Sequence, residues 1–224
     1  MQAILRWSLW LLMSVVIVTA LLVAPLSQGF EGLYGKNPES SRIVYFHVPL
    51  AIASFIAFLA AAAHSVGYLR KRRMESDYAA TAAVEVGLLF CVLATVTGGV
   101  WAQVQWGVFW NWDPRQTSIL LAILFYGAYL ALRGAIEDQE VRARISAAYS
   151  ALGFIVAPFL FFILPRMAQT SLHPKPASAE MDPEILFVVL AGVVANTALF
   201  FWMKNLRCRV LALEAARDPL LDDL

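Results

Sequence analysis

The sequence is poor in charged residues and in cysteine. Only 15% of its 224 residues are charged, whereas 60% are hydrophobic and the mean hydropathy is +0.67. This composition excludes an ordinary soluble domain and is typical of a chain that crosses a membrane several times. The net charge of +1 gives no reason to expect a nucleic-acid partner. Cys91 lies in an apolar run and Cys208 in a basic stretch, so the two cysteines indicate neither a disulfide framework nor a zinc motif.

Six hydrophobic stretches are long enough to cross a bilayer, because a spanning helix needs about 20 apolar residues. We therefore expect an all-α polytopic membrane protein with a single domain over residues 1–224. The expected spans are residues 5–26, 43–69, 80–102, 117–133, 145–165 and 184–203. The first stretch is interpreted as a membrane helix and not as a secretory signal, because it is long and lacks a clean small-residue cleavage site before Pro25.

The lysines and arginines are unevenly distributed among the connections. Six spans put both termini on one side, and that side then carries 12 of the 17 basic residues. The positive-inside rule predicts cytoplasmic termini, with residues 27–42, 103–116 and 166–183 outside. The basic run at residues 70–73 is then explained by topology and by anionic lipid. The chain after Met203 is expected to be a short cytoplasmic extension.

The second outer connection is unusually rich in tryptophan. Residues 101–117, WAQVQWGVFWNWDPRQT, contain four of the seven tryptophans of the chain. They can form an aromatic belt at the membrane surface or a platform for a large flat ligand. If the segment is helical, Trp106, Phe109, Trp110 and Asp113 share one face, because their spacing is i, i+3, i+4 and i+7.

The end of this segment has the pattern of a helix start. Asp113, Pro114 and Gln116 occupy the positions of an N-cap acid, an N1 proline and an N3 glutamine. The pattern recurs less completely at residues 182–184, Asp-Pro-Glu, before the sixth span. We therefore expect Asp113 to cap the fourth span, which is compatible with a second role at a ligand.

The three histidines lie at different depths. His47 and His173 are expected near the outer surface, whereas His64 lies near the inner end of the second span. Each outer histidine is either a hydrated, hydrogen-bonded side chain or a metal ligand. Two imidazoles without cysteines or clustered carboxylates fit axial ligation of haem iron better than a tetrahedral zinc site. Pro49 and Pro174 restrict the backbone beside these two histidines.

Several other polar residues have two interpretations each. The outer cations reach lipid headgroups or pair with the two carboxylates of a haem. These cations are Arg42, Arg115, Arg166 and Lys175. Glu85 is more simply a hydrated acid at a helix end than a proton or partner site. The pair Gly98-Gly99 predicts a close approach of two helices.

Three motifs together resemble a known family. Residues 106–118, WGVFWNWDPRQTS, resemble the tryptophan-rich WWD signature of haem-handling proteins in cytochrome c biogenesis. HVP at residues 47–49 and SLHP at residues 171–174 flank it in the order that these proteins have. With six spans and this length, nearly the whole chain resembles the haem exporter protein C (CcmC) family of cytochrome c maturation. Because of Pro114, the sequence DPR at residues 113–115 is also similar to that of the related cytochrome c synthase branch, CcsA. Proteins of that branch have more spans and more histidines.

The resemblance implies a multi-pass protein of the bacterial inner membrane that holds a non-covalent b-type haem at the periplasmic face. The residues that it assigns to this site are His47 and His173 as axial iron ligands, with Trp106, Phe109, Trp110, Trp112, Asp113 and Arg115 around the haem. The implied partners are the haem chaperone CcmE, which receives the haem, the small protein CcmD and the ABC-type subunits CcmA and CcmB. The protein would deliver haem and would not be an enzyme. The alternatives are a CcsA-like subunit that attaches haem to apocytochrome and an assembly subunit whose aromatics form only a belt.

Overall fold

The structure is a computed structural model that describes residues 2–24, 38–167, 171–173 and 183–222. Within these ranges the chain has no strand, and six helical segments are long and apolar enough to cross a membrane. The expected all-α fold with six membrane-spanning segments is therefore confirmed.

The helices follow the expected spans in order, with two interrupted segments. The elements are α1 (Gln2–Val18) with the π-helical turn η1 (Thr19–Val23), the 3-10 helix η3 (Pro38–Ile43), α2 (Val44–Lys71), α3 (Met74–Trp106), α4 (Pro114–Gly134), α5 (Gln139–Ala151), α6 (Gly153–Pro158), the π-helical turn η4 (Phe159–Ile163), α7 (Leu164–Met167) and α8 (Pro183–Asp222). The fifth span is thus made of α5, α6, η4 and α7, and its π-helical turn directly follows Pro158, which removes a helical hydrogen bond.

The last helix is much longer than the expected sixth span. The chain after Met203 is not a separate tail, because α8 continues to Asp222. Residues 204–217 are rich in leucine, alanine and arginine, which favour helix. Arg207 in this part also forms an ion pair with Glu85 of α3, so tertiary contacts hold the extension against the bundle.

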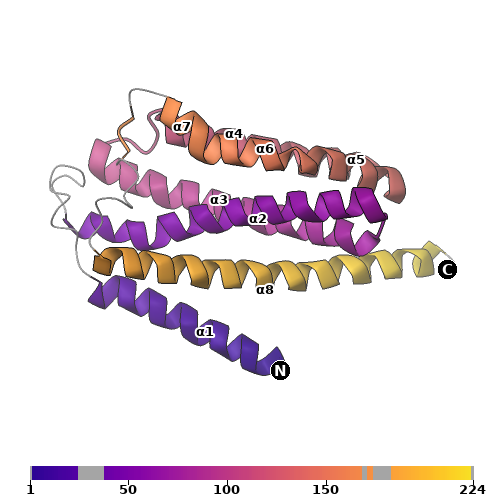
Figure 1. The fold of residues 1–224 in the computed structure, drawn as a ribbon, viewed down its shortest axis with the longest axis horizontal. Coiled ribbons are helices and arrows are strands. Elements are labelled where there is room, and N and C mark those ends of the chain that lie inside the picture. Colours follow the sequence, from indigo (N-terminus) through magenta and orange to yellow (C-terminus); the bar gives the residue numbers. More distant parts are fainter. Residues whose placement is uncertain (1, 25–37, 168–170, 174–182, 223–224) are drawn as a thin grey trace.

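The antiparallel pair of α2 and α3 forms the centre of the bundle (Figure 1). The segment from α4 to α7 covers one side of this pair, and α8 covers the other. Helix α1 packs mainly against α8 and is the outermost layer. The start of α1 and the end of α8 point to the same end of the bundle, where α2 turns into α3 (Figure 1). An even number of crossings produces this arrangement.

Small residues allow the central helices to approach closely. A Cβ atom at Gly87 of α3 would lie 2.9 Å from the Cβ of Ala57 on α2, so the glycine is required at this crossing. Phe58 of α2 then stacks on Tyr126 of α4, with ring centroids 3.6 Å apart. This stack joins the α4 layer to the central pair.

Two ion pairs connect helices in the half of the bundle that contains the α2–α3 turn. Arg133 of α4 donates two hydrogen bonds, of 2.8 and 2.6 Å, to the buried carboxylate of Asp77. Arg207 of α8 donates two hydrogen bonds, of 2.6 and 3.1 Å, to Glu85 of α3. Glu85 therefore has an ion-pair partner that the sequence did not indicate, and its side chain is still 28% exposed.

Candidate functional site

The tryptophan-rich segment is a helix end followed by a loop. Helix α3 ends at Trp106 because Gly107 adopts a left-handed conformation with a φ of 78°, which terminates the helix. Residues 107–113 are not helical, so the predicted helical face that joins Trp106 to Asp113 was wrong. Trp112 also has a positive φ, of 62°, which is unfavourable for a bulky residue and holds the loop in a sharp turn.

The predicted helix start at Asp113 is confirmed. Asp113 is the N-cap of α4, its Oδ1 accepts a 2.9 Å hydrogen bond from the backbone N–H of Arg115, and Pro114 is the first helical residue. Gln116 differs from a capping-box glutamine, because its side chain binds the backbone of Asn111 at 3.0 Å and of Phe109 at 3.3 Å. It thus fixes the preceding loop to α4. The similar acid at residue 182 lies outside the described residues.

The carboxylate of Asp113 also joins α4 to the segment 171–173. Its Oδ2 accepts hydrogen bonds from the Ser171 hydroxyl at 2.9 Å and from the Leu172 N–H at 2.7 Å. Its Oδ1 lies 2.6 Å from Nδ1 of His173. Because an ionised carboxylate only accepts, Nδ1 of His173 donates and Nε2 is left for another partner. No pattern in the sequence indicated this contact, which joins residues 60 positions apart.

The pKa of Asp113 results from two opposing influences. Burial raises it, since only 5% of the residue is exposed. The hydrogen bonds from the His173 ring and from the N–H groups of Arg115 and Leu172 lower it, and they outweigh burial. The pKa therefore lies well below its usual range, and Asp113 is ionised at neutral pH.

The ring of His47 is held by helix α3. Nδ1 of His47 lies 2.9 Å from the carbonyl oxygen of Ala94, which can only accept, so Nδ1 carries the hydrogen of the neutral ring. A Cβ at Gly98 would lie 2.8 Å from Cε1 of the same ring. Gly98 therefore provides the space in which the imidazole fits, and Nε2 is left for another partner.

Gly98 and Gly99 accommodate side chains instead of a tightly packed helix backbone. A Cβ at Gly99 would overlap Cζ of Phe109, so the loop folds the Phe109 ring onto this glycine. The glycine pair therefore admits a side chain of α2 at Gly98, as a close approach of two helices requires, but a loop residue and not a helix covers Gly99. The glycines are required because His47 and Phe109 both approach α3 at this point.

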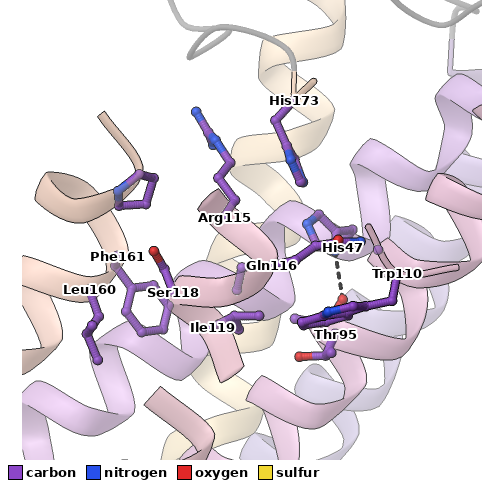
Figure 2. A pocket seen from close by; sticks show the side chains of 15 residues that line it. His47, Thr95, Trp110, Arg115, Gln116, Ser118, Ile119, Leu160, Phe161 and His173 are labelled. Carbon is purple, nitrogen blue, oxygen red and sulfur yellow. Dashed lines mark hydrogen bonds between the residues drawn. The ribbon is translucent and has the colours of Figure 1, made fainter. Parts of the chain in front are cut away.

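His47 and His173 line one pocket at the end of the bundle where α2 and α4 begin and α3 ends. We call it the histidine pocket; its volume is about 720 Å³, including the part open to solvent. Figure 2 shows His173 and Arg115 on one side of the pocket and His47 and Trp110 on the other. The sequence did not indicate that Leu160 and Phe161 of η4 also line it.

The other predicted aromatic residues lie around the pocket without lining it. Trp106 packs edge-to-face on His173, with ring centroids 5.0 Å apart. Trp112 is 67% exposed and packs edge-to-face on Trp110 at 5.8 Å. Trp110 is therefore the tryptophan of the predicted platform that faces the pocket, and Trp106 supports His173 instead.

The predicted outer cations have different environments. Arg115 lines the pocket, and its guanidinium forms no hydrogen bond with the residues that the structure describes. Arg166 donates to the carbonyl of Phe162 at 2.6 Å. Arg42 donates from Nη1 to the carbonyls of Ala20 and Ala24, and so holds the end of the first span instead of facing the pocket. Lys175 lies outside the described residues.

Comparison with known proteins identifies the family. The family model described as "CcmC: Heme exporter protein C" matches residues 1–220. The chain belongs to the heme exporter protein C family. A "Heme exporter protein C" of Paracoccus denitrificans is 35% identical over 164 residues, which cover 70% of this chain and 68% of the relative. The corresponding protein of Bradyrhizobium diazoefficiens is 34% identical over 165 residues, 71% of this chain and 62% of the relative.

A relative with lower sequence identity to this chain carries the same name. The protein of that name from Escherichia coli K12 is 31% identical over 135 residues, which cover 60% of this chain and 55% of the relative. These alignments thus span between about half and two thirds of the relatives' own lengths. The predicted resemblance to the haem exporter protein C family is confirmed, and the six apolar helical segments of the described residues agree with a multi-pass membrane protein.

Proposed function

We propose that the histidine pocket binds a b-type haem without a covalent bond, with His47 and His173 as the axial ligands of the iron. The observation that carries this proposal is that both rings line one pocket and that each is held through Nδ1, by Ala94 and by Asp113. Each ring keeps Nε2 for the metal. Histidine ligands of metals usually have their second nitrogen held in this way.

The remaining residues of the pocket suit the other parts of a haem. The guanidinium of Arg115 is a cation without a hydrogen-bond partner among the described residues, and it can pair with a propionate. The rings of Trp110 and Phe161 supply apolar surface for the porphyrin. When bound, the haem supplies the iron to be carried, and the protein residues only ligate, orient and shield it.

We propose further that the haem is presented at the periplasmic face and is delivered to a CcmE-like haem chaperone. Delivery requires that an axial bond be released. His47 is part of helix α2, and its ring is held against α3. His173 lies outside the helices, and its ring is held by the side chain of Asp113. His173 is therefore the ligand that leaves the iron when haem moves to the partner. A CcmD-like protein and CcmA- and CcmB-like subunits complete the assembly in the bacterial inner membrane.

The ligand assignment can be tested by visible spectroscopy of the purified protein in detergent. We expect that His47→Ala and His173→Ala each change the Soret band and that the double variant loses most of its haem. His64→Ala is the matched control, because His64 lies towards the other end of α2 and should leave the spectrum unchanged. A full and unchanged Soret band in the double variant would refute the assignment.

A further experiment separates haem delivery to a chaperone from haem attachment to an apocytochrome, because the protein that receives the haem differs. Cells that express this chain with a CcmE-like chaperone should accumulate haem on the chaperone. Cells that express this chain with an apocytochrome, but without the other maturation proteins, should yield no holocytochrome. Holocytochrome in the second experiment would favour a CcsA-like synthase.

A further inference from the structure

A second cavity lies at the end of the bundle opposite to the histidine pocket. We call it the turn cavity, because it is lined by Arg73, Glu75, Ser76 and Ala79 at and after the α2–α3 turn, together with His64 of α2. Its volume is about 730 Å³, including the part open to solvent. None of these residues contributes to the histidine pocket.

Lys204 of α8 places a buried positive charge beside this cavity. Only 8% of the residue is exposed, and its Nζ lies 3.3 Å from Nε2 of His64. Among the described residues, no carboxylate lies within ion-pair distance of this ammonium group. A buried charge without a counter-ion is unfavourable, so an anion close to Lys204 would stabilise this end of the bundle.

The contact with Lys204 determines which nitrogen of His64 carries the hydrogen. An ammonium group only donates, so Nε2 of His64 accepts and the hydrogen of the neutral ring is on Nδ1. In the described part of the chain, Nδ1 of His64 has no acceptor. The ring lines the turn cavity and therefore has a donor available for a ligand.

Further donors come from the start of α3. Arg73 is the N-cap of this helix and makes no side-chain capping bond, and neither its guanidinium nor the Ser76 hydroxyl has a hydrogen-bond partner among the described residues. The N-terminus of a long helix favours anions, because the helix dipole is positive there. In α3 the N–H of Ser76 already bonds the carbonyl of Arg73, so the side chains supply the donors named above. Arginine, a hydroxyl and a helix N-terminus around one cavity suit the oxygens of a phosphate group.

We propose that the turn cavity binds a phosphate group, supplied either by the headgroup of an anionic phospholipid or by free phosphate. The turn cavity lies where two spanning helices end and next to the basic run at residues 70–73, which is the depth at which lipid headgroups meet a membrane protein. Glu75 lines the same cavity and repels an anion, so it weakens this binding. The ligand is thus held by Arg73 and His64 against the opposing charge of Glu75.

Native mass spectrometry of the full chain, titrated with phosphatidylglycerol, tests this proposal. Arg73→Gln should weaken binding of this lipid about tenfold, the size expected for one charge-assisted hydrogen bond. Arg70→Gln is the matched control, since it removes the same charge from an exposed arginine that does not line the cavity. Its binding should stay within about twofold of the parent chain. Glu75→Gln should strengthen binding.

The outcomes separate a specific site from general electrostatic attraction and identify the source of the phosphate. Equal losses in Arg73→Gln and Arg70→Gln, or no gain in Glu75→Gln, would overturn the proposal. Displacement of the bound lipid by millimolar inorganic phosphate would assign the cavity to free phosphate, and retention would assign it to the lipid headgroup. The haem spectrum should be the same in all three variants, so this test is independent of the proposed haem site.

Discussion

At the scale of single residues, Asp113 has three connected tasks. It caps α4, it accepts hydrogen bonds from Ser171 and Leu172, and it holds the ring of His173 through Nδ1. A carboxylate bound to one imidazole nitrogen fixes the orientation of the ring and makes the other nitrogen more basic. Asp113 therefore acts on a haem through His173, as a positioning residue, and does not line the pocket itself.

We predict that Asp113→Asn weakens haem binding by about 10- to 100-fold, the usual effect of losing such a partner of a metal-ligating histidine. Asparagine is an equally good N-cap, so the start of α4 should be preserved. Haem titration with a visible spectrum measures both the affinity and the ligation. Ser171→Ala is the control, because it removes the hydrogen bonds of the Ser171 hydroxyl to Asp113 and to the His173 N–H but keeps the charge of Asp113, and its effect should be smaller. Unchanged affinity and spectrum in Asp113→Asn would contradict the assignment.

A second prediction concerns the space that Gly98 leaves for His47. In Gly98→Ala the new methyl group would lie 2.8 Å from Cε1 of His47, so the ring must move and haem binding should fall by at least tenfold. Gly127→Ala is the control, because a methyl group there meets no atom within 4 Å and should stabilise α4 by about 0.5–1 kcal/mol. Haem content and thermal unfolding distinguish the two variants. Equal haem content in both would show that the His47 ring is not confined by Gly98.

At the scale of helices, the two arginine–carboxylate pairs connect different elements and differ in burial. The Arg133–Asp77 pair joins α4 to α3, and its side chains are 13% and 1% exposed. The Arg207–Glu85 pair joins α8 to α3, and its side chains are 35% and 28% exposed. Loss of one partner from a buried pair leaves an unpaired charge in a region of low dielectric constant, whereas water can solvate the survivor of an exposed pair.

We therefore predict that Arg133→Met lowers the free energy of unfolding by about 3–5 kcal/mol. The same substitution at the other pair, Arg207→Met, should lower it by only about 1 kcal/mol or less. Denaturant unfolding in detergent measures both values. The double variant Asp77→Leu/Arg133→Met should recover much of the lost stability, because no unpaired charge remains. A similar loss in both single variants would show that burial does not separate the two pairs.

At the scale of the whole molecule, the bundle has two polar ends of different character. The histidine pocket is at one end, and the turn cavity with the basic run at residues 70–73 is at the other. The end of α8 and the start of α1 point towards the turn-cavity end (Figure 1). The positive-inside rule therefore predicts that the basic end faces the cytoplasm and that the histidine pocket faces the periplasm.

Single cysteines test this orientation in a Cys208→Ser background. We predict that Val108→Cys, in the exposed loop beside the histidine pocket, reacts with a membrane-impermeant thiol reagent in intact spheroplasts. Glu137→Cys, in the exposed connection between α4 and α5 at the other end, should react only after lysis. Cys91 is buried and needs no replacement. The reverse pattern of labelling would place the histidine pocket in the cytoplasm.

The sequence by itself determined the number of spans and the helix start at Asp113. Both depend on local features: the length of an apolar run sets a span, and an acid followed by proline sets an N-cap. The sequence also carried the WWD resemblance, because that motif is contiguous. The prediction that Trp106 and Asp113 share one helical face was wrong, because Gly107 ends the helix between them. Residue spacing predicts a shared face only where the helix is continuous.

Only the tertiary structure decided which polar residues meet. Asp113 and His173 are 60 positions apart, and Glu85 and Arg207 are 122 positions apart. Likewise, the role of Gly98 depends on the ring of His47 on a neighbouring helix. Helix caps and span lengths follow from neighbouring residues. The contacts above depend on how complete helices pack, and the surfaces that pack together come from distant parts of the chain.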